Sequence, residues 1–167
     1  MRLKYTVIGL AAGLAVGAAA TYFVVGSPAP AQAPPAPSVA APTRFETFAL
    51  ALPALGVDRT LRVYLPPGYA SCSDCRYPVV YFMDAQNLFD AATGYAGEWG
   101  VDEVLDALHA KHGLAVIAVG IDHGGEARMQ ELSVWEHAEF APAKGEAFLA
   151  DLIAAVKPAV DARYRTQ

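Results

Sequence analysis

Polar residues with useful chemistry directly follow a short apolar stretch of the chain. Residues 79–83 are Val-Val-Tyr-Phe-Met, which is typical of a buried strand, and Asp84-Ala85-Gln86-Asn87 follows as a polar, turn-forming segment. In an α/β sheet, ligands bind outside the carboxyl ends of the parallel strands. Asp84, Ala85, Gln86 and Asn87 are therefore candidate site residues, and an ordinary polar turn is the alternative interpretation.

A second strand and a helix are expected beside the first strand. Residues 114–121 form another continuous apolar run, and residues 101–112 carry apolar residues at helical spacing, with Gly113 as a C-terminal stop. Apolar runs without alternation are typical of parallel strands that are buried on both faces. Strand, helix and strand in this order predict a right-handed βαβ unit, so the predicted fold class is α/β.

The segment after the second apolar run is long and rich in glycine and charge. Residues 120–142 exceed the length of roughly 12 to 15 residues beyond which loops usually serve a site. Because this loop leaves the carboxyl end of a parallel strand, we expect it to face the same cleft. His123 and Trp135 are its candidates for substrate binding, and Glu126 with Arg128 is expected to form an ion pair at the rim.

The flanking segments predict the rest of the domain. Residues 45–52 and 59–65 are expected to form an antiparallel pair of strands, and the second of them alternates between apolar and polar side chains. Residues 144–164 carry an apolar face at helical spacing, and Pro158 is expected to kink this helix or to end its first part. No further strand follows to cover the sheet, so we expect the chain to be the amino-terminal part of a larger domain.

The first 43 residues predict a leader and a linker rather than a domain. Residues 1–26 are interpreted as a signal peptide or, since about 20 apolar residues can span a bilayer, as a membrane anchor. Residues 27–43 form a Pro/Ala-rich linker. Positive charge before the apolar run predicts that residues 44–167 are periplasmic or secreted, or are held outside the cytoplasm by an inner-membrane tether at residues 5–26.

Charge and cysteine content narrow the classes of partner. The chain has a formal net charge of -5 and no basic stripe, which argues against a nucleic acid partner. Cys72 and Cys75 form a Cys-x-x-Cys pair, for which a local disulfide in an exported protein is the first interpretation. A redox motif and a zinc site are the alternatives, and neither a metal nor an organic cofactor is predicted.

Five blocks of sequence follow one another in a familiar order. They are residues 62–69 (Arg-Val-Tyr-Leu-Pro-Pro-Gly-Tyr), 77–81 (Tyr-Pro-Val-Val-Tyr), 84–90 (Asp-Ala-Gln-Asn-Leu-Phe-Asp), 98–103 (Glu-Trp-Gly-Val-Asp-Glu) and 120–122 (Gly-Ile-Asp). Over about residues 44–166 the chain resembles the esterase family of the α/β-hydrolase superfamily, which includes S-formylglutathione hydrolases, siderophore esterases, feruloyl esterases and mycolyltransferases. The resemblance implies a cofactor-free serine hydrolase that cleaves a small-molecule carboxylic ester through an acyl-enzyme.

The resemblance also implies which parts of the site this chain holds. The family's serine lies in a Gly-x-Ser-x-Gly elbow, which is absent here, so the serine, acid and histidine are expected beyond Gln167. Matching Asp84-Ala85-Gln86 onto the family's loop makes the Gln86 backbone N–H one donor of the oxyanion hole. Ala85 stands where glycine is common, and it would strain the loop if residue 85 needed a positive φ.

Two functional interpretations therefore remain. The first is an ester hydrolase of which this chain is an incomplete, and by itself inactive, part. The second is a non-catalytic exported or membrane-tethered binding module on an esterase scaffold. The sequence leaves the oligomeric state open.

Overall fold

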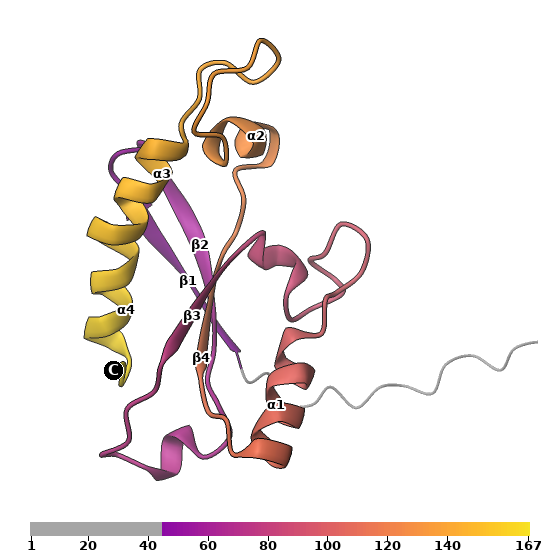
Figure 1. The fold of residues 1–167 in the computed structure, drawn as a ribbon, viewed down its shortest axis with the longest axis vertical. Helices are drawn as coiled ribbons and strands as arrows, with labels where there is room; N and C mark the ends of the chain where they lie inside the picture. Colours follow the sequence, from indigo (N-terminus) through magenta and orange to yellow (C-terminus); the bar gives the residue numbers. More distant parts are fainter. Residues whose placement is uncertain (1–44) are drawn as a thin grey trace, which may run out of the picture. The chain divides into compact units, whose positions relative to one another are not determined.

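The computed structural model describes residues 45–167 (Figure 1). The predicted leader at residues 1–26 and linker at residues 27–43 lie outside the described residues, so export and membrane attachment stay predictions. No helix in the described part of the chain is long and apolar enough to cross a membrane.

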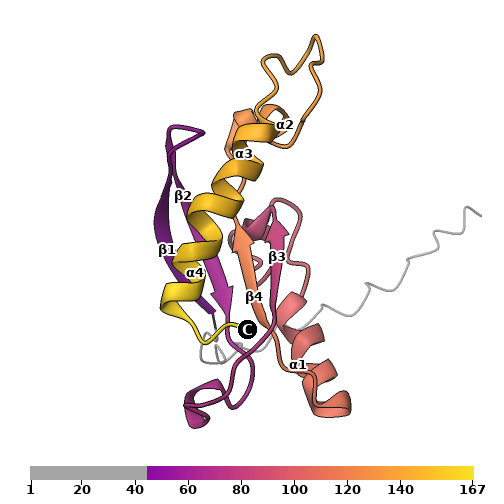
Figure 2. The same cartoon turned by 60° about the vertical axis from the view of Figure 1, so that its left-hand side comes forward.

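Four strands form a mixed sheet in spatial order β1-β2-β4-β3 (Figure 2). They are β1 (Phe45–Leu52), β2 (Val57–Tyr64), β3 (Val79–Met83) and β4 (Ile117–Ile121). β1 and β2 pair antiparallel and β3 and β4 pair parallel, which confirms both predicted pairings. β2 also pairs antiparallel with β4, so the amino-terminal hairpin is joined to the βαβ unit through β4.

β4 lies inside the sheet and β3 lies at its edge. All five residues of β4 are buried, as expected. The same expectation is wrong for β3, in which Val80 is 41% and Met83 is 46% exposed, because β4 is its only strand neighbour among the described residues. The last residues of the chain approach the outer edge just before β3, where the Tyr77 N–H donates to Arg165 O (2.9 Å) and the Gln167 N–H donates to Tyr77 O (3.0 Å).

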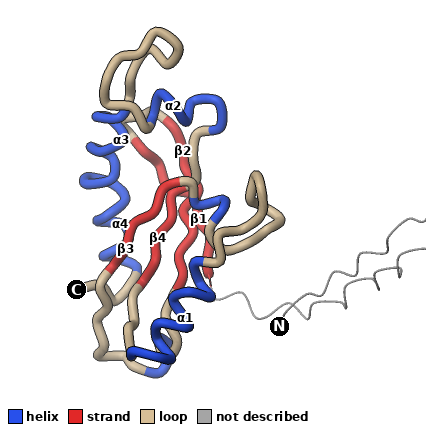
Figure 3. Tube along the Cα trace, turned by 45° about the vertical axis from the view of Figure 1, so that its right-hand side comes forward, coloured by secondary structure: helices blue, strands red, loops and turns tan. Residues whose placement is uncertain are grey.

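Helices cover both faces of the sheet and enclose two cores. α1 (Val101–His112) has the predicted bounds and lies on one face, while α3 (Gly145–Asp151), η4 (Leu152–Val156) and α4 (Lys157–Arg163) follow one another on the other face (Figures 1 and 3). Alternate residues of β4 serve the two cores. Val119 packs in the core that contains Val156, and Ala118 packs in the core that contains Leu88.

The carboxyl-terminal helix contains a π-helical turn. The predicted helix at residues 144–164 begins at Gly145 and passes through η4 into α4, which begins at Lys157. Pro158 stands in the first turn of α4, directly after the π-helical turn. The helical backbone continues without a break to Arg163, so the prediction that Pro158 ends a first helical part is wrong.

Short helical turns and a disulfide shape the connections. The turns are η1 (Tyr69–Ser71), η2 (Ala85–Asn87), η3 (Gly125–Ala127) and α2 (Arg128–Glu131). Cys72 and Cys75 are joined in a disulfide in the connection between β2 and β3. A disulfide has no thiolate to offer a metal, so in this state the pair is a local cross-link.

Candidate active site

The turn after β3 brings the first group of candidates together. Asp84 begins η2 with a φ of 57°, and it is the only described residue other than glycine with a positive φ. Ala85 therefore has no positive φ, and the strain considered for residue 85 is absent. A cost on the order of 1 kcal/mol falls on Asp84 instead, so its contacts must hold the turn in place.

Ala85 packs against β4 rather than lining the site. Its side chain is fully buried, and a Cβ built on Gly120 would lie 2.5 Å from the Ala85 Cβ and 2.6 Å from Leu88 Cδ1. The turn after β3 thus approaches β4 closely because residue 120 has no side chain. Ala85, a candidate for substrate binding, faces the core.

Arg128 holds Asp84 in a bidentate ion pair. Nε of Arg128 donates to Oδ1 and Nη2 donates to Oδ2, each at 2.7 Å. The hydrogen bonds from Arg128 lower the pKa of Asp84, which keeps this carboxyl group charged at neutral pH. The expected ion pair between Glu126 and Arg128 is wrong, because Arg128 turns to the loop after β3 and so ties the two loops together.

The two backbone polar groups of Gln86 differ: its carbonyl is hydrogen-bonded, and its N–H is free. Its carbonyl oxygen accepts a hydrogen bond from Thr93 Oγ1 (2.7 Å). Its N–H belongs to the first amides of a helical turn and has no hydrogen-bond partner among the described residues. A free amide of this kind can stabilise negative charge on a reacting carbonyl oxygen.

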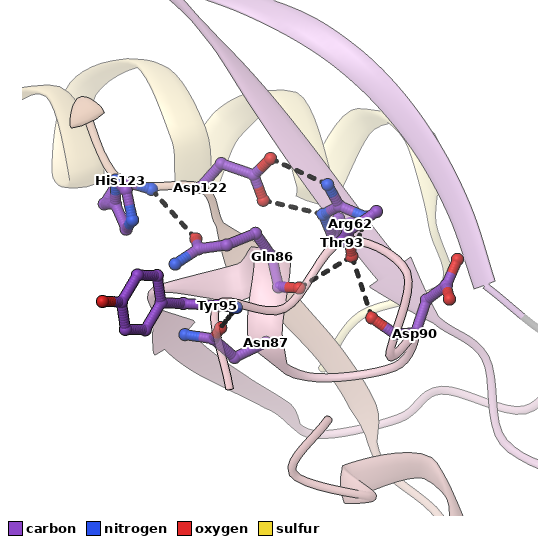
Figure 4. A network of polar contacts seen from close by, with 8 residues as sticks. All are labelled: Arg62, Gln86, Asn87, Asp90, Thr93, Tyr95, Asp122 and His123. Atoms are coloured by element: carbon purple, nitrogen blue, oxygen red, sulfur yellow. Dashed lines mark hydrogen bonds and ion pairs between the residues drawn. The ribbon is translucent and has the colours of Figure 1, made fainter. Parts of the chain in front are cut away.

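A polar network behind the turn was missed by the sequence patterns (Figure 4). Arg62 of β2 donates from Nε to Asp122 Oδ1 (2.7 Å) and from Nη2 to Asp122 Oδ2 (3.0 Å). Nη1 of Arg62 lies 3.3 Å from Thr93 Oγ1, so the network continues to the carbonyl of Gln86. The hydrogen bonds to Asp122 raise the pKa of Arg62. The available signal was a basic residue on the polar face of β2 and an acid at the end of β4.

Backbone amides orient the side chains of Gln86 and Asn87. The Tyr95 N–H donates to Asn87 Oδ1 (3.0 Å), and the His123 N–H donates to Gln86 Oε1 (3.4 Å). Both side-chain nitrogens therefore turn to the side where Tyr95 and His123 lie (Figure 4). The Gly125 N–H donates to His123 Nδ1 (2.8 Å), which places the proton of the neutral imidazole on Nε2.

These side chains line a pocket of about 290 Å³ at the carboxyl ends of β3 and β4. The lining residues are Asp84, Gln86, Asn87, Tyr95, Trp99, His123 and Arg128. The polar candidates from both loops thus meet, as expected for the carboxyl ends of parallel strands. Trp135 does not join them: it is 80% exposed and lies outside the lining. Tyr95 is an addition that the sequence did not single out, and Arg128, expected at the rim beside Glu126, lines the pocket as the partner of Asp84.

An acidic group stands at the start of α1, next to Trp99 in the sequence. The carboxylate oxygens of Glu98, Asp102 and Glu103 lie within 4.8 Å of one another. Burial, and then a hydrogen bond with Glu103, raise the pKa of Asp102 to about 6. The group has the geometry for a cation, but two of its members are exposed, and exposed acidic groups are common without one.

We expect Asp102→Asn to stabilise the protein at pH 7 by about 1 kcal/mol. The pKa of Asp102 is higher in the folded state, about 6, than its ordinary value of 3.8. The native protein therefore loses stability as the pH rises between these values and bears the full cost above them. Urea unfolding from about pH 3 to pH 8 measures the effect. In Asp102→Asn the loss of stability between these pH values should disappear, whereas the exposed control Asp74→Asn should keep it. A loss in Asp102→Asn as large as in the unchanged protein contradicts the prediction.

Comparison with known proteins identifies relatives of this fold. Residues 53–167 match the model of the Esterase family, whose description is "Putative esterase". An IroE-like serine hydrolase from Shewanella oneidensis is 22% identical with a TM-score of 0.57, over 73% of this chain and 39% of that one. The BES protein from Bacillus cereus is 18% identical with a TM-score of 0.56, over 75% of this chain and 48% of that one. No curated protein sequence gives a significant match.

The chain spans less than half of the length of these solved structures. An uncharacterised protein from Capnocytophaga ochracea, with 15% identity and a TM-score of 0.56, is matched over 73% of this chain and 30% of its own length. At these identities the likeness concerns the fold, which is an incomplete α/β-hydrolase sheet with its covering helices.

Proposed function

Because the chain belongs to the Esterase family, we propose that it is part of a serine-type carboxylic ester hydrolase that works through an acyl-enzyme. In this proposal the described residues supply the electrophilic half of the site. The observation that carries it is the Gln86 N–H, which has no partner in the described part of the chain and belongs to a residue that lines the pocket. The ligand is a small-molecule ester, and no cofactor takes part.

The proposed role of Gln86 follows from the charge that develops during acyl transfer. Attack on an ester carbonyl places negative charge on its oxygen, and one preorganised N–H donor lowers the barrier by about 3 kcal/mol. Preorganisation is supplied here by two contacts. Arg128 fixes Asp84 at the start of the turn, and Thr93 holds the carbonyl of Gln86.

The nucleophile and its base are proposed to lie in the part of the relatives' length that this chain does not span. The serines of the described residues are Ser71, Ser73 and Ser133, and none of them hydrogen-bonds to a histidine there. His123 uses Nδ1 to accept from a backbone amide, which suits a pocket residue better than a base that must accept a proton from serine.

The proposal is tested first by comparing the chain with a completed form. The 167-residue chain alone is expected to show no turnover of p-nitrophenyl acetate above background. A hybrid that continues after Gln167 with the carboxyl-terminal part of the Shewanella oneidensis hydrolase is expected to hydrolyse it. Turnover by the purified 167-residue chain, or a folded hybrid without turnover, contradicts the proposal.

The assignment of the Gln86 amide is tested in the same hybrid. Gln86→Pro removes the N–H, fits the φ of a helical first turn, and is expected to lower kcat by about 100-fold to 1,000-fold. Gln86→Ala removes only the side chain, and it should change KM rather than kcat. Equal losses of kcat in two variants of unchanged thermal stability would show that the backbone amide is not the donor.

A second candidate function is a non-catalytic binding module. The observation that favours it is the pair of exposed rings at the pocket, since Tyr95 is 97% and Trp99 is 58% exposed. Such a module would bind a small molecule in the pocket while the completed hybrid stays inactive. Export remains part of either proposal, and the disulfide of Cys72 and Cys75 supports it because such bonds persist in oxidising compartments.

A further inference from the structure

Acceptor atoms around the pocket are already engaged within the protein. Both carboxylate oxygens of Asp84 accept from Arg128, at 2.7 Å each. The side-chain oxygens of Gln86 and Asn87 accept from backbone amides, at 3.4 and 3.0 Å. The carbonyl oxygen of Asn87 accepts from the backbone N–H of Trp99 at 2.7 Å. A ligand therefore finds few oxygen atoms to which it could donate a hydrogen bond.

The groups left for a ligand are mainly donors. The side-chain nitrogens of Gln86 and Asn87 and the indole N–H of Trp99 have no hydrogen-bond partner among residues 45–167. The Nε2–H of His123 joins them, because Nδ1 is occupied as an acceptor. Among the lining side chains, the Tyr95 hydroxyl is the one uncommitted group that can also accept.

The carboxylates of Asp84, which lines the pocket, and of Asp122, behind the turn, are each paired with an arginine. Asp84 is neutralised by Arg128 at 2.7 Å, and Asp122 behind the turn is neutralised by Arg62 at 2.7 Å. No unpaired carboxylate is among the lining side chains, although the whole chain carries a net charge of -5. At the lining side chains an anion thus meets donors and no unpaired carboxylate, and an ammonium group finds neither a free carboxylate nor a free amide oxygen there. The acidic group of Glu98, Asp102 and Glu103 stands next to Trp99 in the sequence but does not line the pocket.

Two aromatic rings add a flat apolar wall. Tyr95 and Trp99 both line the pocket, and both rings are largely exposed rather than packed in the core. Exposed rings that border donor groups suit a planar ring, which can stack on one aromatic face while its substituent reaches the donors.

We propose that this pocket binds a carboxylate carried on an aromatic ring, with the carboxylate on the nitrogens of Asn87 and Gln86 and the ring against Trp99 or Tyr95. Hydrogen bonds from neutral donors to a charged oxygen are stronger than those to a neutral one, which selects a carboxylate over an amide or alcohol. Only the assignment of a substrate rests on the proposed function. If the protein is an ester hydrolase, its substrates are esters whose acyl or alcohol part carries an aromatic ring with a carboxylate. Binding itself needs no nucleophile.

The 167-residue chain can be titrated directly with sodium benzoate. Trp99 and Trp135 are its two tryptophans, so Trp135→Phe leaves Trp99 as the fluorescent reporter, and Trp99→Phe leaves one that lies outside the pocket. Benzoate is expected to change the fluorescence of Trp99 and not that of Trp135. It should bind at least about tenfold more tightly than benzylammonium chloride, with neutral benzamide between them.

A matched pair of variants tests the donors. Asn87→Asp keeps an oxygen for the Tyr95 N–H but replaces the free nitrogen with a charged oxygen, and it should weaken benzoate binding at least about tenfold. Gln167→Glu makes the same chemical change beside Tyr77, at the opposite end of β3, and should leave the affinity unchanged.

Several results would overturn the inference. They are equal affinity for benzoate and benzylammonium, a fluorescence change that comes from Trp135, unchanged benzoate binding by Asn87→Asp, or a neutral sugar such as glucose that binds more tightly than benzoate. Failure of the hybrid to hydrolyse esters, with benzoate binding intact, would refute the proposed hydrolase and leave the pocket as a binding site. Hydrolysis without benzoate binding would refute only the ligand class.

Discussion

Replacing Glu131 by Gln is expected to lower the free energy of unfolding by about 3 to 5 kcal/mol. Arg59 of β2 and Glu131 of α2 form a buried ion pair, with Nη2 and Oε1 2.6 Å apart and side chains only 9% and 6% exposed. Glutamine keeps a hydrogen-bond acceptor but leaves the guanidinium of Arg59 buried without a counter-charge. A buried charge that loses its partner destabilises far more than an intact pair stabilises.

Urea unfolding followed by circular dichroism measures this loss. The double variant Arg59→Met with Glu131→Leu removes both charges and is expected to recover most of the stability. Lys157→Met is the matched surface control: it breaks an exposed pair with Asp161 and should cost no more than about 0.5 kcal/mol. If Glu131→Gln costs no more than the surface control, the ion pair is not buried as described.

The ion pair also bears on the pocket, because α2 carries Arg128 as well as Glu131. Glu131 fastens this short helix to β2, and Arg128 reaches from it to Asp84. Glu131→Gln is therefore expected to weaken benzoate binding even under conditions in which the protein stays folded.

Gly120→Ala is expected to destabilise the protein by about 2 to 3 kcal/mol. The added Cβ would lie 2.5 Å from the Ala85 Cβ and 2.6 Å from Leu88 Cδ1, in the middle of a buried strand. The clash is with the turn that holds Gln86, so the variant should also lose benzoate binding. Thermal unfolding and the fluorescence titration measure the two effects separately.

Two further variants separate the steric cause from a general intolerance of alanine. Gly113→Ala meets no atom within 4 Å but has a φ of 68°, so it should cost only about 1 kcal/mol and leave the pocket unchanged. Adding Ala85→Gly to Gly120→Ala removes one of the two clashing methyl groups and should restore part of the lost stability. No recovery in the double variant would place the cause outside the turn after β3.

Much of the backbone could be predicted because its signals are local. The continuous apolar run at residues 79–83 and the helical spacing at residues 101–112 specify β3 and α1 without reference to the rest of the chain. Gly113 marks the end of α1 because its own backbone adopts a positive φ. Burial of β3 on both faces could not be predicted from its own sequence, because a strand is buried only if other strands pair with both of its edges.

The polar turn after β3 was also evident from the sequence by itself, as was the expectation that His123 would meet it. Both segments leave the carboxyl ends of neighbouring parallel strands, and that geometry brings them to one place. The family resemblance added a role for the Gln86 amide. The structure supplied the observation that this amide has no partner among the described residues.

Tertiary structure alone decided which charges pair and which groups remain free. The partners of Asp84, Asp122 and Glu131 are arginines 44, 60 and 72 residues away, and no local pattern selects an arginine over such separations. Ala85 can pack against β4 only because residue 120, on another strand, is a glycine. The pocket became a site for acceptor groups because its own oxygens are used internally, and only assembly of the two loops determines that.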